Sequence, residues 1–141
     1  MALIEVGNTY INPEHLYGVS DVIETPPPSE GLSATFSFQM YLEGSSAAFA
    51  TQNQSQAQSL QADVLAALQK QSGDVFSSGG QNLIYTEVNV IGGIGSDPAG
   101  IDPHAAAFSV QMDGVSCIFR YPTFDAAEKG RADLVASING A

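Results

Sequence analysis

The sequence predicts an α+β fold in which two antiparallel β-sheet units, each followed by one helix, are joined in tandem. Two observations support this prediction. The first is that residues 35–69 resemble residues 105–139 at a constant shift of 70 residues, without a gap. The identical pairs are Phe38/Phe108, Gly44/Gly114, Ser46/Ser116, Phe49/Phe119, Ala57/Ala127, Ala62/Ala132, Asp63/Asp133 and Ala66/Ala136. The second is that each copy changes from a period of two residues to one of 3.6, which indicates strands followed by a helix.

The repeat divides the chain of 141 residues into a first unit over residues 1–73 and a second unit over residues 74–141. We expect each unit to contain about four to five strands before its C-terminal helix, and the two units to form one compact body. Because two like units pack together, we also expect a pseudo-twofold axis between them, as in an isologous dimer.

Each copy contains a pair of strands closed by a tight turn. Apolar and polar residues alternate through residues 35–42 and again through 106–112, which indicates strands with one buried face. Gly44 and Gly114 follow these strands, each after an acidic residue. Glycine tolerates the positive φ angle that a hairpin turn needs, so both strands are expected to turn back here.

A helix is expected after each strand pair. Ser55-x-x-Gln58 and Asp125-x-x-Glu128 lie at matching positions, and each has the spacing of a capping box at a helix N-terminus. Apolar residues then recur at helical spacing, which gives each helix one face to place on its sheet. These residues are Ala57, Leu60, Val64 and Leu68 in the first copy, and Ala127, Leu134 and Ile138 in the second.

The remaining chain predicts further strands before each copy. Residues 3–12 form an expected hairpin with Gly7 in its turn, and residues 16–24 have the spacing of a strand. Three consecutive prolines, 26–28, favour an extended spacer because proline cannot donate a hydrogen bond to a sheet. Residues 83–91 are expected to form one strand of the second unit.

The charge of the chain argues against several kinds of partner. Four basic residues stand against fifteen acidic ones, for a net charge of −11 and an isoelectric point near 4.1. Nucleic-acid binding depends on basic groups that displace counterions from phosphates, and anionic membrane surfaces attract basic segments. We therefore expect neither a nucleic acid nor a membrane as a partner.

The sequence also bears on location and redox chemistry. No apolar run approaches the roughly 18 residues of a membrane helix, and the first residues lack the basic-then-apolar plan of a signal peptide. We expect a soluble protein of the cytoplasm or of a virion. Cys117 is the single cysteine, and its inward strand position predicts a buried structural thiol.

Two histidines offer a hypothetical metal site. Both lie in turns that contain proline, His15 beside Glu14 and His104 two residues after Asp102. If the pseudo-symmetry brought the two turns together, these four side chains would supply nitrogen and oxygen ligands of the kind that zinc accepts. The simpler interpretation is two surface turns, and we expect no cofactor.

No motif in the sequence specifies a reaction. The chain lacks a G-x-S-x-G nucleophile elbow and a dinucleotide-binding fingerprint, and its acidic residues are too many for a carboxylate pair to be informative. We therefore predict a non-catalytic structural subunit that binds protein partners or itself, such as a component of a phage or virus particle. A small-ligand or metal-binding module and an enzyme of unknown class are the alternatives.

Overall fold

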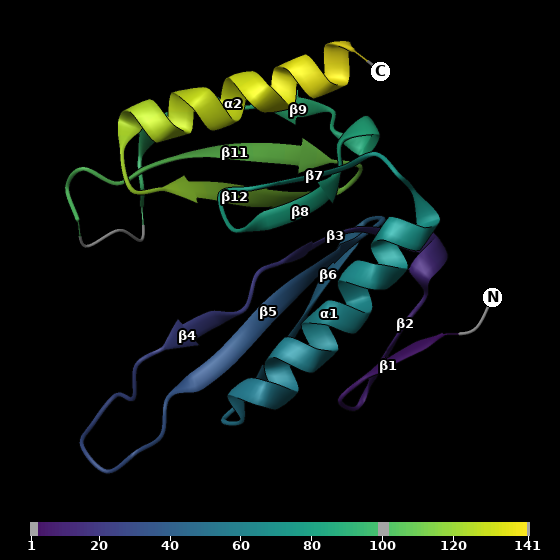
Figure 1. Ribbon diagram of the computed structural model, residues 1–141. Coiled ribbons are helices and arrows are strands. Elements are labelled where there is room, and N and C mark those ends of the chain that lie inside the picture. The colour runs from purple at the N-terminus through teal and green to yellow at the C-terminus, as the bar shows by residue number, and fades with distance from the viewer. Residues whose placement is uncertain (1–2, 99–101, 141) are drawn as a thin grey trace.

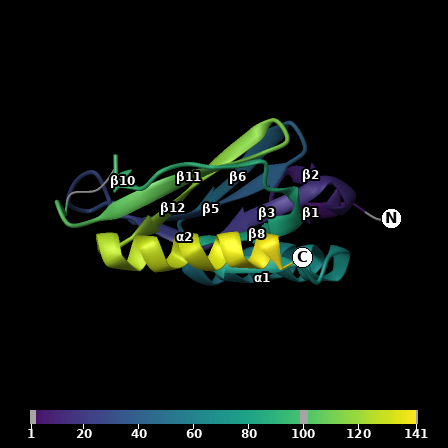
Figure 2. The ribbon, with the colours of Figure 1, turned by 90° about the horizontal axis from the view of Figure 1, so that it is seen from above.

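The computed structural model describes residues 3–98 and 102–140, and they form an α+β fold with three antiparallel sheets and two α-helices. The second α-helix lies at the C-terminal end of the chain, as predicted. Both helices lie on one side of the molecule and the strands lie on the other, so the fold has two layers (Figure 2). In the described part of the chain, no helix is long and apolar enough to cross a membrane.

The same order of elements occurs in residues 1–73 and in residues 74–141. The first part contains β1 (Ile4–Val6), β2 (Thr9–Ile11), the 3-10 helix η1 (Pro13–His15), β3 (Leu16–Ser20), β4 (Ile23–Thr25), β5 (Thr35–Leu42), β6 (Ser45–Thr51) and α1 (Gln54–Gln71). The second part contains β7 (Val75–Ser78), β8 (Gln81–Ile84), η2 (Tyr85–Glu87), β9 (Val90–Ile91), β10 (Gly95–Ser96), β11 (Ala106–Met112), β12 (Val115–Tyr121) and α2 (Phe124–Asn139). Among the described residues, each part therefore has six strands where four to five were predicted.

The strands form one large sheet, one small sheet and an isolated hairpin (Figure 1). In the large sheet, β5 pairs with β6 on one edge and with β3 and β4 on the other, and β8 then pairs with β3 and β7 with β8. In the small sheet, β11 pairs with β12 on one edge and with β9 and β10 on the other. The hairpin is β1 with β2. The prediction of one sheet for each unit is thus incomplete, since β7 and β8 join the sheet of the first unit.

The predicted strand pairs and helices match the structure closely. Phe38 lies opposite Phe49 in the β5–β6 pair, and Phe108 lies opposite Phe119 in the β11–β12 pair. Both hairpins turn at glycine, with φ angles of 74° at Gly44 and 75° at Gly114. No side chain is easily placed at such positive φ angles, which explains the shared residue.

The helices begin two residues earlier than the predicted capping boxes indicate. Asn53 is the N-cap of α1, and its side chain accepts a hydrogen bond from the N–H of Gln56. Thr123 is the N-cap of α2, and its hydroxyl accepts one from the N–H of Ala126. Both cap residues are short polar types that satisfy a free backbone donor of the first turn.

Residues 83–91 do not form the single strand that was predicted. The chain pairs in the large sheet through β8, turns through η2, and enters the small sheet through β9. The reason is topological, because one continuous strand could not end in both sheets. Residues 16–24 are divided in a similar way into β3 and β4, which both pair with β5.

Two buried clusters form the core, and each contains a residue from the other part of the chain. The first cluster includes Phe38, Val64 and Leu68, and it also contains Ile84 of β8. The second contains Phe108, Phe119, Leu134 and others, together with Tyr41 of β5. Because each cluster contains a residue of the other part, the contact between the two parts is a packed interface. We call this interface the seam; in it, β8 pairs with β3 and β12 lies against β5.

The seam does not have the predicted twofold symmetry. By their place in the element order, β2 and β9 are the counterparts of β8 and β3. A twofold axis would therefore pair β2 with β9 as well. In residues 3–98 and 102–140, β2 pairs only with β1 and β9 only with β11. The two parts are arranged head to tail instead.

Candidate functional site

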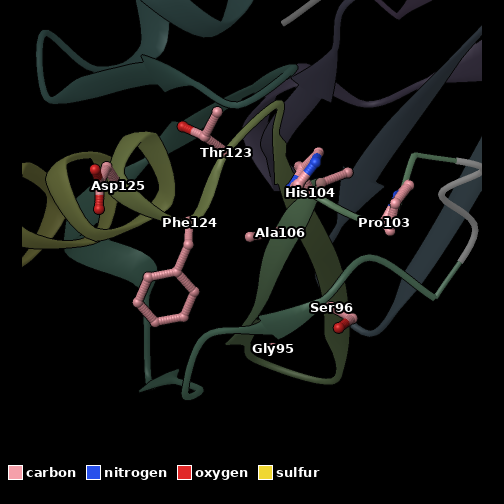
Figure 3. Close-up of a pocket in the computed structure, with 9 residues that line it drawn as sticks. Gly95, Ser96, Pro103, His104, Ala106, Thr123, Phe124 and Asp125 are labelled. Atoms are coloured by element: carbon pink, nitrogen blue, oxygen red, sulfur yellow. The ribbon is translucent and has the colours of Figure 1, made fainter.

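A hollow of 530 Å³ opens at the N-terminus of α2 (Figure 3). Gly95 and Ser96 of β10, the turn from Pro103 to Ala106, and the start of α2 from Thr123 to Asp125 line it. Two polar side chains in and beside it, Thr123 and Asp102, bind backbone N–H groups of the same turns. The Asp102 carboxylate beside it accepts a hydrogen bond from the N–H of His104 (2.9 Å), and the Thr123 hydroxyl caps α2. These contacts hold turns in place and do not form a catalytic arrangement.

The other predicted histidine lies in a different setting. His15 Nδ1 lies 3.0 Å from Glu43 Oε2, and both side chains are about half exposed, at 53% and 51%. Solvent weakens such surface ion pairs, so this contact contributes little to stability. The backbone N–H of the neighbouring Glu14 donates to the side chain of Asn12.

The two proposed halves of the metal site occupy unlike places in the fold. Glu14 and His15 belong to η1, whose counterpart in the element order is η2, whereas Asp102 and His104 belong to the connection between β10 and β11. Within the part of the chain that the structure describes, no three His, Cys, Asp or Glu side chains gather closely enough to hold a metal ion. The metal-site hypothesis therefore draws no support from the observed contacts.

A second hollow follows the seam, where Ile23, Gln81, Ile118 and Arg120 line two adjoining spaces of 300 Å³ and 700 Å³. Gln81 is 6% exposed, and its Nε2 donates to the carbonyl of Ile118 at 2.9 Å. Arg120 Nε donates to Asp97 Oδ1 at 3.2 Å. Both hydrogen bonds join elements within residues 74–141, and Ile23 of the first part lines the hollow opposite them.

Two titratable groups buried in the seam, Cys117 and Tyr41, are neutral at pH 7. Burial raises the pKa of the Cys117 thiol to about 12, so the thiolate needed for nucleophilic attack is not formed. Burial, followed by the proximity of Cys117, raises the pKa of Tyr41 to about 12 as well. A group used in acid–base catalysis would instead have a pKa near the working pH.

Two uncovered strand edges stand out from these interior contacts. Tyr10 of β2 is 63% exposed and Val90 of β9 is 51% exposed, although both belong to strands. Each of the two strands is paired along one edge only among the described residues. A strand edge presents unpaired N–H and C=O groups, to which another strand can add.

The sequence favours edge strands of the repeat as contacts that add to a partner's sheet, but it does not single out β2 and β9. It predicted the hairpin over residues 3–12 but not its neighbours, because alternation shows which side chains face the core and not which edge lacks a partner. The available signal was the apolar residue Tyr10 at an outward position. Comparison with known proteins finds no matching family model, no similar curated protein and no similar solved structure.

Proposed function

We propose that the protein is a non-catalytic assembly subunit, built from two tandem β-sheet-plus-helix units over residues 1–73 and 74–141. The tandem arrangement is supported by the element order and by strand registers. Met40 pairs with Val19, and the residue 70 positions later, Val110, pairs with Ile91, which lies 72 positions after Val19. Each element before the β4–β5 connection corresponds to an element about 72 positions later in the chain. Each element after that connection corresponds to one about 70 positions later.

The observation that carries the assembly function is the pair of open strand edges. Among the described residues, β2 and β9 present exposed apolar side chains beside an edge that no second strand pairs, and neither strand contains a charged residue. Charged residues on an edge strand commonly prevent unwanted pairing, so their absence here favours a protein partner. Addition of a strand to such an edge is a known mode of protein recognition.

The net charge of −11 is consistent with this kind of partner. It opposes binding to nucleic acid, whose affinity for proteins comes largely from basic groups. A subunit that packs against many copies of itself or against a shell, as in a phage or virus particle, is the setting we propose. The contacts of the two hollows favour neither an enzyme nor a metal-binding module.

Light scattering after size-exclusion chromatography tests the proposed function, together with thermal unfolding in the presence of zinc and a panel of metabolites. We expect a mass that increases with protein concentration and no shift of the melting temperature by a ligand. A ligand that binds the folded state raises the melting temperature by mass action. A strict monomer with a large shift on zinc would contradict the assembly function and favour the metal-binding alternative.

A further inference from the structure

The seam shows how one part of the chain accepts a strand from the other. The hairpin β7–β8 packs on its own part, since Phe76 and Leu83 belong to the second core cluster. Its outer strand then pairs with β3, which places Leu83 opposite Gly18 and Asn82 opposite Val19. The N–H of Asp21 also donates to the carbonyl of Gly80 at 2.9 Å.

The hairpin β1–β2 has the same build as β7–β8. Each has a two-residue turn that begins with a left-handed glycine, Gly7 at φ 61° and Gly79 at φ 57°. Each also packs on its own part, because Ile11 is buried in the first core cluster as Leu83 is in the second. The difference lies at the outer edge, where Tyr10 is 63% exposed and its counterpart Asn82 is 5% exposed.

The strand β9 has the backbone geometry of β3 and lacks only the added strand. The N–H of Gly92 donates to the carbonyl of Ser109, so Ile91 and Val110 form a non-hydrogen-bonded pair. The N–H and C=O of Ile91 therefore point to the open edge. They face the same way as those of Val19, which pairs with Asn82 in the seam.

The helix contact at this edge does not block it. Arg131 Nε donates to the carbonyl of Gly92 at 2.8 Å. The counterpart contact in the first part is Gln61 Nε2 to the carbonyl of Ser20 at 3.1 Å, and it coexists with the pairing of β8 to β3. Arg131 Nη2 also lies 3.5 Å from the carbonyl oxygen of Ile91. A strand can add to β9 while Arg131 keeps its shorter hydrogen bond to Gly92, and only this longer contact to Ile91 must give way.

We infer that β2 of one copy of the chain adds to β9 of a second copy, in the register already present in the seam. Ile11 then lies opposite Val90, Tyr10 opposite Ile91, and Thr9 opposite Gly92 of the other copy. This inference rests on the proposed assembly function and names its interface. In Figure 1, β9 lies at the top beside α2 and the hairpin β1–β2 lies at the lower right beside α1. Because the contact joins unlike surfaces of the two copies, it is head to tail and generates a ring or a filament.

Surfaces beside these strands fit the same partner. In the seam, β12 lies against β5, and Ile118 of β12 is half-buried. Among the described residues the corresponding strand β6 pairs only with β5, and Ala48, at the position of Ile118, is exposed. On the receiving side, an open hollow of 290 Å³ occurs at the turn between β11 and β12. Its lining residues are Gln111, Met112, Gly114, Val115 and Ser116.

One residue differs between the seam and the inferred contact. Gly18 allows close approach, since a Cβ atom there would lie 2.3 Å from Leu83 Cδ2 and 2.7 Å from the carbonyl oxygen of Asn82. Val90 occupies the corresponding position in β9. The contact between copies is therefore wider at this point than the seam, and weaker.

A cysteine pair tests the register. Residues directly opposite in a hydrogen-bonded antiparallel pair have Cα atoms about 5.5 Å apart, which a disulfide can span. We expect oxidation of the double variant Y10C/I91C to give a ladder of covalent oligomers, or one closed ring, on a non-reducing gel. The matched control is E5C/I91C, because Glu5 lies opposite Tyr10 on β1, one strand further from β9. Circular dichroism confirms that both variants fold.

The outcomes separate this inference from the proposed function. A Y10C/I91C ladder that the control lacks supports the β2–β9 contact. Wild-type association by light scattering without a specific Y10C/I91C ladder overturns the β2–β9 contact and leaves the assembly function in place, through another surface. A monomer at every concentration with no ladder contradicts both.

Discussion

The hairpins β1–β2 and β7–β8 are built alike and have different neighbours. Both turn at a left-handed glycine and bury one residue of the outer strand in the adjacent core, Ile11 or Leu83. Only β8 continues into a sheet, where it pairs with β3. The exposure of β2 is thus set by what lies beside the hairpin and not by the hairpin itself.

The outer side chains reflect this difference. Asn82 is buried in the seam, and its Nδ2 donates to the carbonyl of Val19 and to Asp21 Oδ1, each at 3.0 Å. Burial of a polar amide requires such partners. Its counterpart Tyr10 is the large exposed side chain of β2. An aromatic side chain at this position can bury apolar area when a second copy arrives and still remain hydrated at its hydroxyl.

The largest predicted effect tests whether the two parts are equivalent. Phe38 and Phe108 are both buried, at 1% and 2% exposed, and both lie opposite a phenylalanine on the return strand. We expect F38A and F108A each to lower the free energy of unfolding by about 3–5 kcal/mol. Because the clusters exchange Tyr41 and Ile84 across the seam, unfolding in urea should remain a single transition in both variants. Separate transitions for the two parts would contradict the shared core.

The next largest effect comes from replacing Gly18 of the seam by valine, the residue that β9 has at the corresponding position, Val90. The G18V variant introduces a Cβ within 2.7 Å of a backbone oxygen of β8, so the strands must separate. We expect a loss of about 1–3 kcal/mol, the usual cost of overpacking. The matched control is G93A, since no atom lies within 4 Å of a Cβ at Gly93. Urea unfolding of both variants measures the difference, and equal losses would show that the seam is not tightly packed at Gly18.

The reverse change at the open edge should strengthen association between copies. The V90G variant removes a side chain that has no equivalent at Gly18 of the seam, so we expect the dissociation constant for association of two copies to be several-fold lower. Glycine also destabilises the strand itself, by about 0.5–1 kcal/mol. The Y10D variant places a charge against the β9 edge and should weaken association about tenfold, or 1.4 kcal/mol. Sedimentation equilibrium measures both constants. If V90G weakened association by more than this strand cost, Val90 would contribute apolar contact with Ile11, and the inference that its side chain keeps the strands apart would be wrong.

The smallest effect concerns the buried groups Cys117 and Tyr41, and it appears only at alkaline pH. Burial raises the pKa of Cys117 from 9.0 to about 12, so the folded state retains this proton more tightly than the unfolded chain. The resulting stability is fully present below pH 9.0 and is lost as the pH rises toward 12, by at most about 1.4 kcal/mol per pH unit. Tyr41 acts in the same direction above pH 10.0. Unfolding in urea at alkaline pH should show a shallower loss for C117A, and an unchanged slope would contradict the burial of the thiol.

Much of the fold could be predicted because its signals are local. The strand pairs, the turn at Gly44 and Gly114 and the two helices follow from alternation, glycine and helical spacing within short stretches. The helix starts were misplaced because Ser55 matched a capping-box pattern. The backbone hydrogen bonds instead begin at the carbonyl of Asn53, which accepts from the N–H of Ala57.

The arrangement of the two parts could not be predicted in the same way. Pairing of β8 with β3 joins residues more than 60 positions apart, as in Val19 with Asn82, and periodicity holds no information about that choice. The twofold axis was wrong for the same reason, since a repeat is compatible with either exchange or head-to-tail packing. The metal hypothesis depended on that axis to unite His15 with His104.

Hydrogen exchange at several protein concentrations tests the head-to-tail contact most directly. Peptides that cover β2 and β9 should gain protection together as the concentration rises from about 1 μM to about 1 mM, the range over which contacts of modest affinity form. Peptides from β3 and β8 serve as the internal reference, because their edges are already paired and should not change. Protection of β2 and β9 with the same midpoint would establish the contact between copies. Unchanged exchange in both strands, or protection of only one of them, would contradict it.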